Sequence, residues 1–172
     1  MSSWTQPVKK VKLGPKFGVV DNWHPNGHRG VDYNGFGSGE PLMAVADGKI
    51  VLVKFSEVLG NVVVLQVGKL FFGYCHLVKP CALKVGTAVK AGQVIAHAGT
   101  TGSASSGVHL HLTLSKVKEG VFGGKVYDAY GFIQKKIADA KKAAVAAKKA
   151  AAPAVTPVVN DVPPVTPKGK TK

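Results

Sequence analysis

The stretch Gly107-Val108-His109-Leu110-His111-Leu112-Thr113-Leu114 carries the pattern that decides the fold. Its leucines alternate with two histidines and a threonine, which is the period of a β-strand with one apolar face. Because successive side chains on a strand point to opposite faces, His109 and His111 should emerge on the same face. Two neighbouring imidazoles on a rigid strand are potential metal ligands, although a His-x-His pair by itself is weak evidence.

The rest of the first 128 residues has the composition of short strands separated by turns. Runs rich in Val, Leu, Ile and Phe are separated by Asp47-Gly48, Leu59-Gly60 and Gly68-Lys69, each suited to a tight turn. No convincing helical period precedes residue 129. We therefore predict a mainly β fold, a small antiparallel β domain that is a sandwich or a partly open barrel. The predicted strands are 31–33, 42–46, 49–55, 61–67, 70–76, 87–96, the histidine stretch, and 121–127.

Composition and charge narrow the class of partner. The chain has 172 residues, 45% of them hydrophobic, and a net charge of +14 in which Arg29 is the single arginine. Sequence-reading nucleic-acid sites favour arginine forks and aromatic stacking platforms, so we predict no nucleic-acid partner. No run of 18 apolar residues and no apolar leader segment occurs, so we expect neither a membrane span nor a signal peptide.

The chain divides into four segments by composition. Residues 1–16 read as an irregular lead-in, and 17–133 as the folded domain. Residues 134–152 continue an Ala/Lys-rich helix whose composition begins at Ala129, and 153–172 read as a Pro/Lys-rich disordered tail. Residues 134–172 carry nine lysines and two aspartates. This end of the chain is either a solvated tether or an electrostatic anchor for an anionic polymer.

Further potential ligands lie outside the histidine stretch. His28 and Asp32 occur four apart in a loop rich in Gly, Asn and Pro, and His76 ends a predicted strand. Strict alternation would place Tyr74 on the side of His76 and Cys75 on the other, so we do not expect Cys75 to be a ligand. A Gly/Ser/Thr-rich loop over 99–107 is flexible enough to let a substrate backbone approach.

These residue types suit a catalytic zinc site. Such sites commonly take three protein ligands from His and carboxylate, and keep a fourth position for water. Residues His28, Asp32, His76, His109 and His111 supply three ligands and two spare imidazoles. The strand pattern does not decide which histidine of the His-x-His pair binds metal. No His-Glu-x-x-His helix occurs, which excludes the common helical zinc-protease arrangement.

The ordered set of motifs resembles a known family. His-x-x-x-Asp in a Gly/Asn loop, Tyr-x-His-Leu, and Gly-x-x-Gly-x-x-x-x-Gly-x-His-Leu-His resemble the lysostaphin-type (LytM-like) zinc metallopeptidases, which cut peptidoglycan peptides. The stretches 41–51 and 85–95 resemble this family too, and the likeness covers roughly 17–133. It implies a small antiparallel β domain with an open groove. It also implies one zinc ion held by His28, Asp32 and His111, with His76 and His109 as the catalytic pair.

The resemblance implies a zinc-dependent endopeptidase of bacterial peptidoglycan that acts at the cell wall as a monomer. Without a recognisable signal peptide, we expect a phage-type endolysin that is made in the host cytoplasm and released at lysis, or one that is virion-borne. The lysine-rich tail could then bind anionic wall polymers. The alternative is a catalytically inactive LytM-like cell-wall binding or activator module. The bond that is cut, the host wall type, the pairing of Cys75 with Cys81, and the roles of His24 and His97 stay open.

Overall fold

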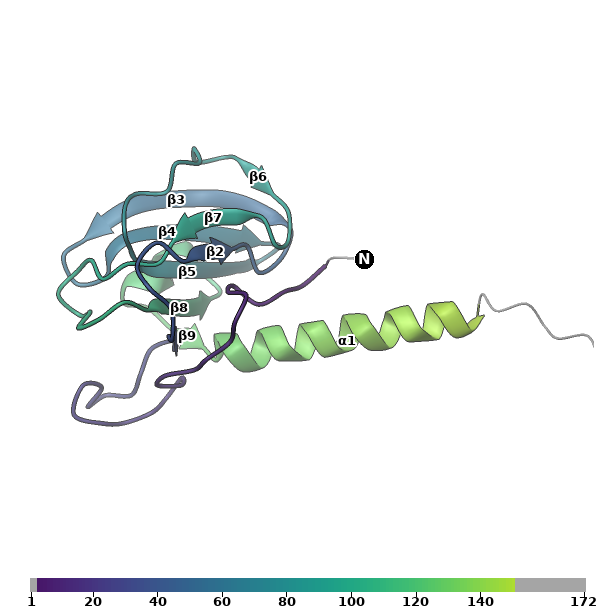
Figure 1. The fold of residues 1–172 in the computed structure, drawn as a ribbon, viewed down its shortest axis with the longest axis horizontal. Coiled ribbons are helices and arrows are strands. Elements are labelled where there is room, and N and C mark those ends of the chain that lie inside the picture. Colours follow the sequence, from purple (N-terminus) through teal and green to yellow (C-terminus); the bar gives the residue numbers. More distant parts are fainter. Residues whose placement is uncertain (1–2, 151–172) are drawn as a thin grey trace, which may run out of the picture.

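The computed structural model describes residues 3–150, which form nine strands, one 3₁₀ helix and one long α-helix (Figure 1). All strand pairs are antiparallel. The elements are β1 (Val31–Tyr33), β2 (Pro41–Met43), β3 (Gly48–Ser56), β4 (Gly60–Val67), β5 (Leu70–Leu77), β6 (Ala88–Val89), β7 (Val94–His97), β8 (Leu110–Ser115), η1 (Lys118–Phe122), β9 (Val126–Tyr127) and α1 (Ala129–Ala150).

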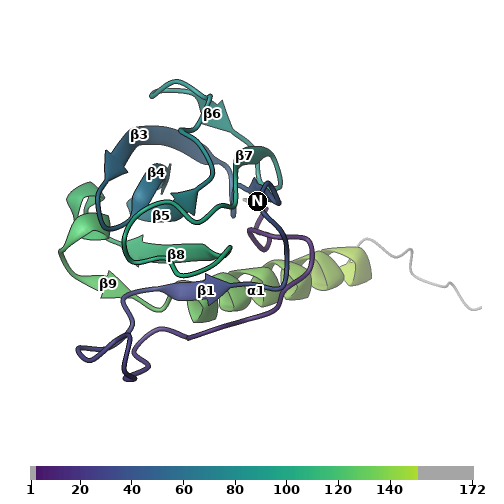
Figure 2. The same cartoon turned by 60° about the vertical axis from the view of Figure 1, so that its left-hand side comes forward.

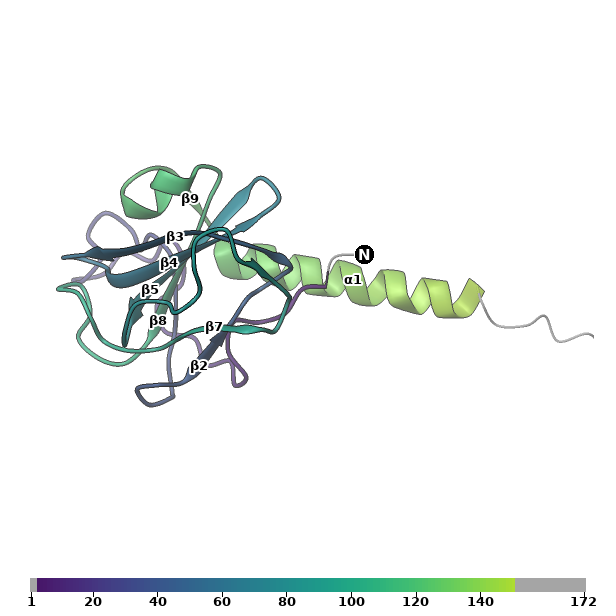
Figure 3. The ribbon, with the colours of Figure 1, turned by 90° about the horizontal axis from the view of Figure 1, so that it is seen from above.

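One large sheet carries most of the strands. Its order is β1-β8-β5-β4-β3-β6, with β9 paired to β8, and Figure 2 shows β3, β4, β5, β8 and β1 following one another. A second sheet of β2 and β7 lies to one side of it (Figure 3). The main core fills the space between the two sheets, where Leu42 and Ile95 pack with Leu65, Tyr74 and Leu112. The predicted mainly β fold with antiparallel sheets is confirmed.

Several predicted strands need correction. The 42–46 strand starts at Pro41 and stops at Met43, and 87–96 forms two short strands with a turn between them. The predicted strand at 121–127 is wrong over most of its length, because η1 ends at Phe122 and β9 covers only Val126–Tyr127. The segment between them contains Gly123 and Gly124, and glycine loses more backbone entropy than other residues when it is fixed in a strand.

The helix α1 is anchored by its first turns. Ala129 and Ile133 are buried in the main core, and the Phe132 ring stands edge-on to Trp4 with centroids 5.5 Å apart. Trp4 belongs to the lead-in, which also contributes the buried Val8 to the core. Beyond Ile137 the helix is mostly exposed and projects away from the sheets in Figure 1. The Ala/Lys helix predicted from composition is therefore present, and one apolar stripe docks it.

No helix within residues 3–150 is long and apolar enough to cross a bilayer. The predictions of a disordered tail at 153–172, and of a wall anchor there, lie outside the described residues.

Candidate metal centre

The predicted site residues converge on the face of the large sheet opposite the main core. Val31 and Tyr33 of β1 are fully buried in that core, so the alternating Asp32 faces the other way. Asp32 lies directly opposite His111 in the pairing of β1 with β8. The loop before β1 brings His28 alongside them, and His109 precedes β8 on the same side. Adjacent sheet positions thus join segments that are far apart in sequence.

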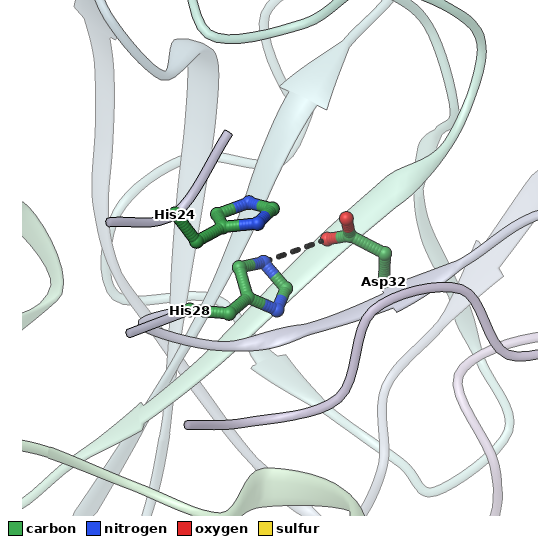
Figure 4. A group of neighbouring side chains, drawn as sticks. All are labelled: His24, His28 and Asp32. Atoms are coloured by element: carbon green, nitrogen blue, oxygen red, sulfur yellow. Dashed lines mark ion pairs between the residues drawn. The ribbon is translucent and has the colours of Figure 1, made fainter. Parts of the chain in front are cut away.

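Three donor atoms of this group lie very close together. His111 Nδ1 is 2.9 Å from Asp32 Oδ1 and 3.0 Å from His28 Nε2, and His28 Nε2 is 3.3 Å from Asp32 Oδ1. The last of these contacts is the dashed line in Figure 4. Bonds of 2.0–2.1 Å from a tetrahedral zinc ion place two ligand atoms roughly 3.3 Å apart. The three atoms therefore match one face of a tetrahedral site.

Backbone carbonyls set the tautomers of the histidines around these atoms. A carbonyl oxygen can only accept a hydrogen bond, so each ring nitrogen beside one must carry the proton. His28 Nδ1 donates to the carbonyl of Lys16 (3.2 Å), His76 Nδ1 to that of Thr101 (2.8 Å), and His109 Nδ1 to that of Gly107 (2.8 Å). In the neutral form of all three rings, Nε2 keeps its lone pair. Such contacts fix ligand orientation in metal sites.

His76 reaches this face through an irregularity in β5. Val62 of β4 opposes both Cys75 and His76, which makes a β-bulge, and His76 has a positive φ of 59°. A bulge redirects side chains, and a positive φ is uncommon for residues other than glycine. The prediction that Tyr74 shares the side of His76 and Cys75 faces away is therefore wrong. Tyr74 packs in the main core, and Cys75 is opposite His111 in the pairing with β8.

Cys75 is nevertheless absent from the group of donor atoms. It is buried with Val62, Val64 and Val121 in a small second apolar cluster, and burial raises the pKa of its thiol. A thiol that is hard to ionise is a poor metal ligand. Cys75 and Cys81 are both free, so the possible disulfide does not form.

Charge at the centre favours a cation beside Asp32. Burial acts to raise the pKa of Asp32, but hydrogen bonds with His111 and His28 outweigh it and hold this pKa far below its usual range. Burial disfavours the His28 cation, yet the Asp32 carboxylate more than compensates and raises the pKa of His28. Burial lowers the pKa of His111, and it lowers that of His76 to about 4. Both rings are therefore neutral at pH 7, as a metal ligand or a proton acceptor must be.

His24 supplies a further potential metal ligand, and its role was left open by the sequence. Its Nδ1 donates to Asp21 Oδ1 at 2.9 Å, so Nε2 is left without a proton in the neutral ring. Its ring centroid is 4.2 Å from that of His28, and potential ligand atoms of His24, His28 and Asp32 lie within 4.8 Å of one another (Figure 4). The set formed by His28, Asp32 and His111 is tighter. His97 ends β7 and lines neither hollow beside the centre.

The centre lies between two hollows. The main hollow, with a volume of about 400 Å³, is lined by the histidines, by Arg29 and Thr113, and by an apolar wall of Val58, Leu59, Val121 and Phe122. The second hollow, of about 240 Å³, is bordered by Asn34, Ser106 and Val108. Both share Trp23, His24, Asp32, Ala104 and His109, so an extended chain could pass across the donor atoms from one to the other.

Sequence reasoning missed the residues that support the histidines. The carbonyl of Thr101 and the close packing of Gly30 against His111 leave no signal in a single sequence. Thr101 Oγ1 also accepts from the amide of Asn61 and donates to the carbonyl of Leu77, which ties the 99–107 loop to β4 and β5. The loop expected to approach a substrate therefore also positions His76.

Comparison with known proteins identifies the family of this chain. A model of the family described as Peptidase family M23 matches residues 26–126. The peptidoglycan DD-endopeptidase ShyB of Vibrio cholerae is 39% identical over 93 residues, which cover 51% of this chain and 21% of ShyB. The chain spans less than a third of the length of the curated relatives it matches.

Solved structures give the same assignment. The catalytic domain of the antimicrobial peptidase lysostaphin from Staphylococcus simulans is 31% identical, with a TM-score of 0.61 over 72% of this chain and 92% of that domain. A zinc-containing peptidase from Vibrio cholerae is 29% identical, with a TM-score of 0.61 over 72% of this chain and 38% of that one. With its motifs, its fold and more than half of its length in agreement, the chain is a LytM-like member of peptidase family M23.

Proposed function

We propose that this protein is a zinc-dependent endopeptidase that hydrolyses peptide bonds in bacterial peptidoglycan. The observation that carries the proposal is the convergence of His28 Nε2, Asp32 Oδ1 and His111 Nδ1, with mutual distances of 2.9–3.3 Å. These atoms would hold a single zinc ion. The names of the relatives, a peptidoglycan endopeptidase and an antimicrobial peptidase, support the substrate class.

The donor set fits zinc rather than a harder cation. Two imidazole nitrogens and one carboxylate oxygen are typical zinc ligands, whereas calcium and magnesium prefer oxygen ligands throughout. When bound, zinc lowers the pKa of a water ligand to about 7 and polarises a carbonyl group.

His76 and His109 lie beside the proposed ligands and are our candidates for handling protons. Their ring centroids are 4.7 Å apart, and His109 Nε2 is 3.9 Å from Asp32 Oδ1. Each Nδ1 is held by a backbone carbonyl, so each Nε2 can accept the proton of an attacking water. A protonated imidazole can then donate a hydrogen bond to the oxyanion that develops on the substrate carbonyl. We assign this work to the two histidines as a pair.

Two neighbouring variants on one stretch test the ligand assignment. His111→Ala should lose zinc and activity, whereas His109→Ala should keep one zinc per chain and lose turnover by about 10²–10⁴-fold, the usual contribution of a positioned acid or base. Zinc is measured by elemental mass spectrometry and turnover on purified sacculi. The control is His97→Ala, at a histidine outside both hollows.

Chelation completes the test. EDTA should abolish release of peptide fragments from sacculi, and one equivalent of zinc should restore it. Zinc loss from His109→Ala but not from His111→Ala would contradict the ligand set. A protein that holds no zinc and leaves sacculi intact would instead be the inactive binding or activator module.

A further inference from the structure

Arg29 is a candidate substrate-binding residue that the metal centre does not use. It is the single arginine of the chain, it directly follows His28, and it lines the main hollow. One nitrogen, Nη2, donates to the carbonyls of Gly124 (2.6 Å) and Gly120 (3.4 Å). Within residues 3–150 the guanidinium forms no ion pair, and Nη1 and Nε donate to no protein group. An oriented cation with unused donors therefore borders the site.

The surroundings of Arg29 select a particular kind of ligand. Val121 and Phe122 line the same hollow with apolar surface. The hollow thus combines a cationic fork with an apolar wall.

We propose that Arg29 binds a free carboxylate of the peptide substrate next to the scissile bond, while a methyl side chain lies against Val121 and Phe122. Guanidinium groups pair with carboxylates through two parallel hydrogen bonds, and Nη2 is already anchored, which orients the fork. The substrate is then an alanyl stem peptide with a free carboxylate. An oligoglycine bridge offers neither that carboxylate nor a side chain. This inference rests on the proposed function and defines its substrate class.

The test compares two synthetic cross-linked alanyl peptides that differ only in a carboxylate or a carboxamide beside the scissile bond. The zinc-loaded full chain should cleave the acid with kcat/KM about 10–100-fold above the amide, the range expected for hydrogen bonds to a charged group. Arg29→Gln should remove that preference by lowering kcat/KM for the acid peptide alone. Lys118→Gln is the matched control, because it removes one positive charge from η1 outside the main hollow.

Equal cleavage of acid and amide by the wild-type protein would overturn the proposal, and so would an equal loss on both peptides in Arg29→Gln. The second result would mean that Arg29 only supports the loop at Gly120 and Gly124. Binding of both peptides to the zinc-loaded His109→Ala variant, measured by calorimetry, separates this inference from the proposed function. If the wild-type protein cleaves neither peptide but the variant binds the acid peptide more tightly than the amide, the hydrolase proposal is refuted and the carboxylate site is supported.

Discussion

Replacing Gly30 with alanine should damage the metal centre without touching a ligand. A Cβ atom at Gly30 would lie 2.7 Å from His111 Nε2 and 2.6 Å from the carbonyl oxygen of Leu112. Ordinary contact begins at 3.4 Å, so the two neighbours are too close by about 0.7 and 0.8 Å. The φ of Gly30 is not positive, so alanine meets no backbone strain there. The clash is therefore the whole structural effect.

Neither neighbour can move freely. Leu112 pairs with Val31 in the β1–β8 ladder, so displacing its carbonyl would disturb the sheet. The His111 ring is held by Asp32 on its other nitrogen, and a shift of the ring would move Nδ1 away from the proposed zinc position. Overpacking a tight site costs about 1–3 kcal/mol, and disturbing support around a ligand lowers metal affinity about 10–100-fold.

Two measurements decide this prediction. In a chain of this size, the melting temperature of the zinc-free protein should fall by about 2–4 °C for each kcal/mol of unfolding free energy that the substitution removes. Competition with a fluorescent chelator should show the weaker zinc binding. Gly37→Ala is the matched control, since a methyl group added at Gly37 would have no atom within 4 Å and the φ of Gly37 is not positive. If Gly30→Ala and Gly37→Ala melt alike and bind zinc alike, the packing account of His111 is refuted.

Three other predictions concern residues outside the proposed zinc ligands. Tyr74→Phe should cost about 1–3 kcal/mol in urea unfolding, because the buried hydroxyl donates to one backbone group of 43–45 and accepts from another. Under native conditions iodoacetamide should label Cys81 but not Cys75, since only Cys75 is fully buried, and mass spectrometry after unfolding should find both reactive. Removing residues 141–172 should leave the melting temperature within about 2 °C of that of the full chain, because the described side chains from 141 onward are mostly exposed. The same truncation should weaken the retention of the protein on cell walls at low salt, because it removes positive charge.

Much of the fold was predictable because hydrophobic alternation directly records burial. The β8 pattern placed His109 and His111 on one face, and the structure has both beside Asp32. The Ala/Lys-rich composition from Ala129 likewise predicted a helix, which the structure has as α1, with Ile133 buried and the later Ala/Lys turns exposed. In these two elements the spacing of hydrophobic residues along the chain matches the face that is buried in the fold, so a single sequence is enough to predict that face.

Short elements were less predictable, since two-residue strands such as β6 and β9 are defined by their partners. Nothing within Val126–Tyr127 distinguishes it from a loop until its pairing with β8 is known. The same limit applies to Thr101, whose carbonyl orients His76. A backbone carbonyl is present at every residue, so the sequence holds no mark of which one will be used.

His76 shows how a functional residue escapes the rule that predicts its neighbours. Strict alternation along β5 would turn its ring into the apolar core with Tyr74, where an imidazole would lack polar partners. The bulge opposite Val62 adds one residue to the strand, and the positive φ of 59° redirects the ring toward His109. Such strained conformations cost about 1–3 kcal/mol and persist only where the surroundings impose them. Here the 2.8 Å hydrogen bond to Thr101 supplies that constraint. The departure from regular β geometry is thus what places a second imidazole beside the proposed zinc ligands.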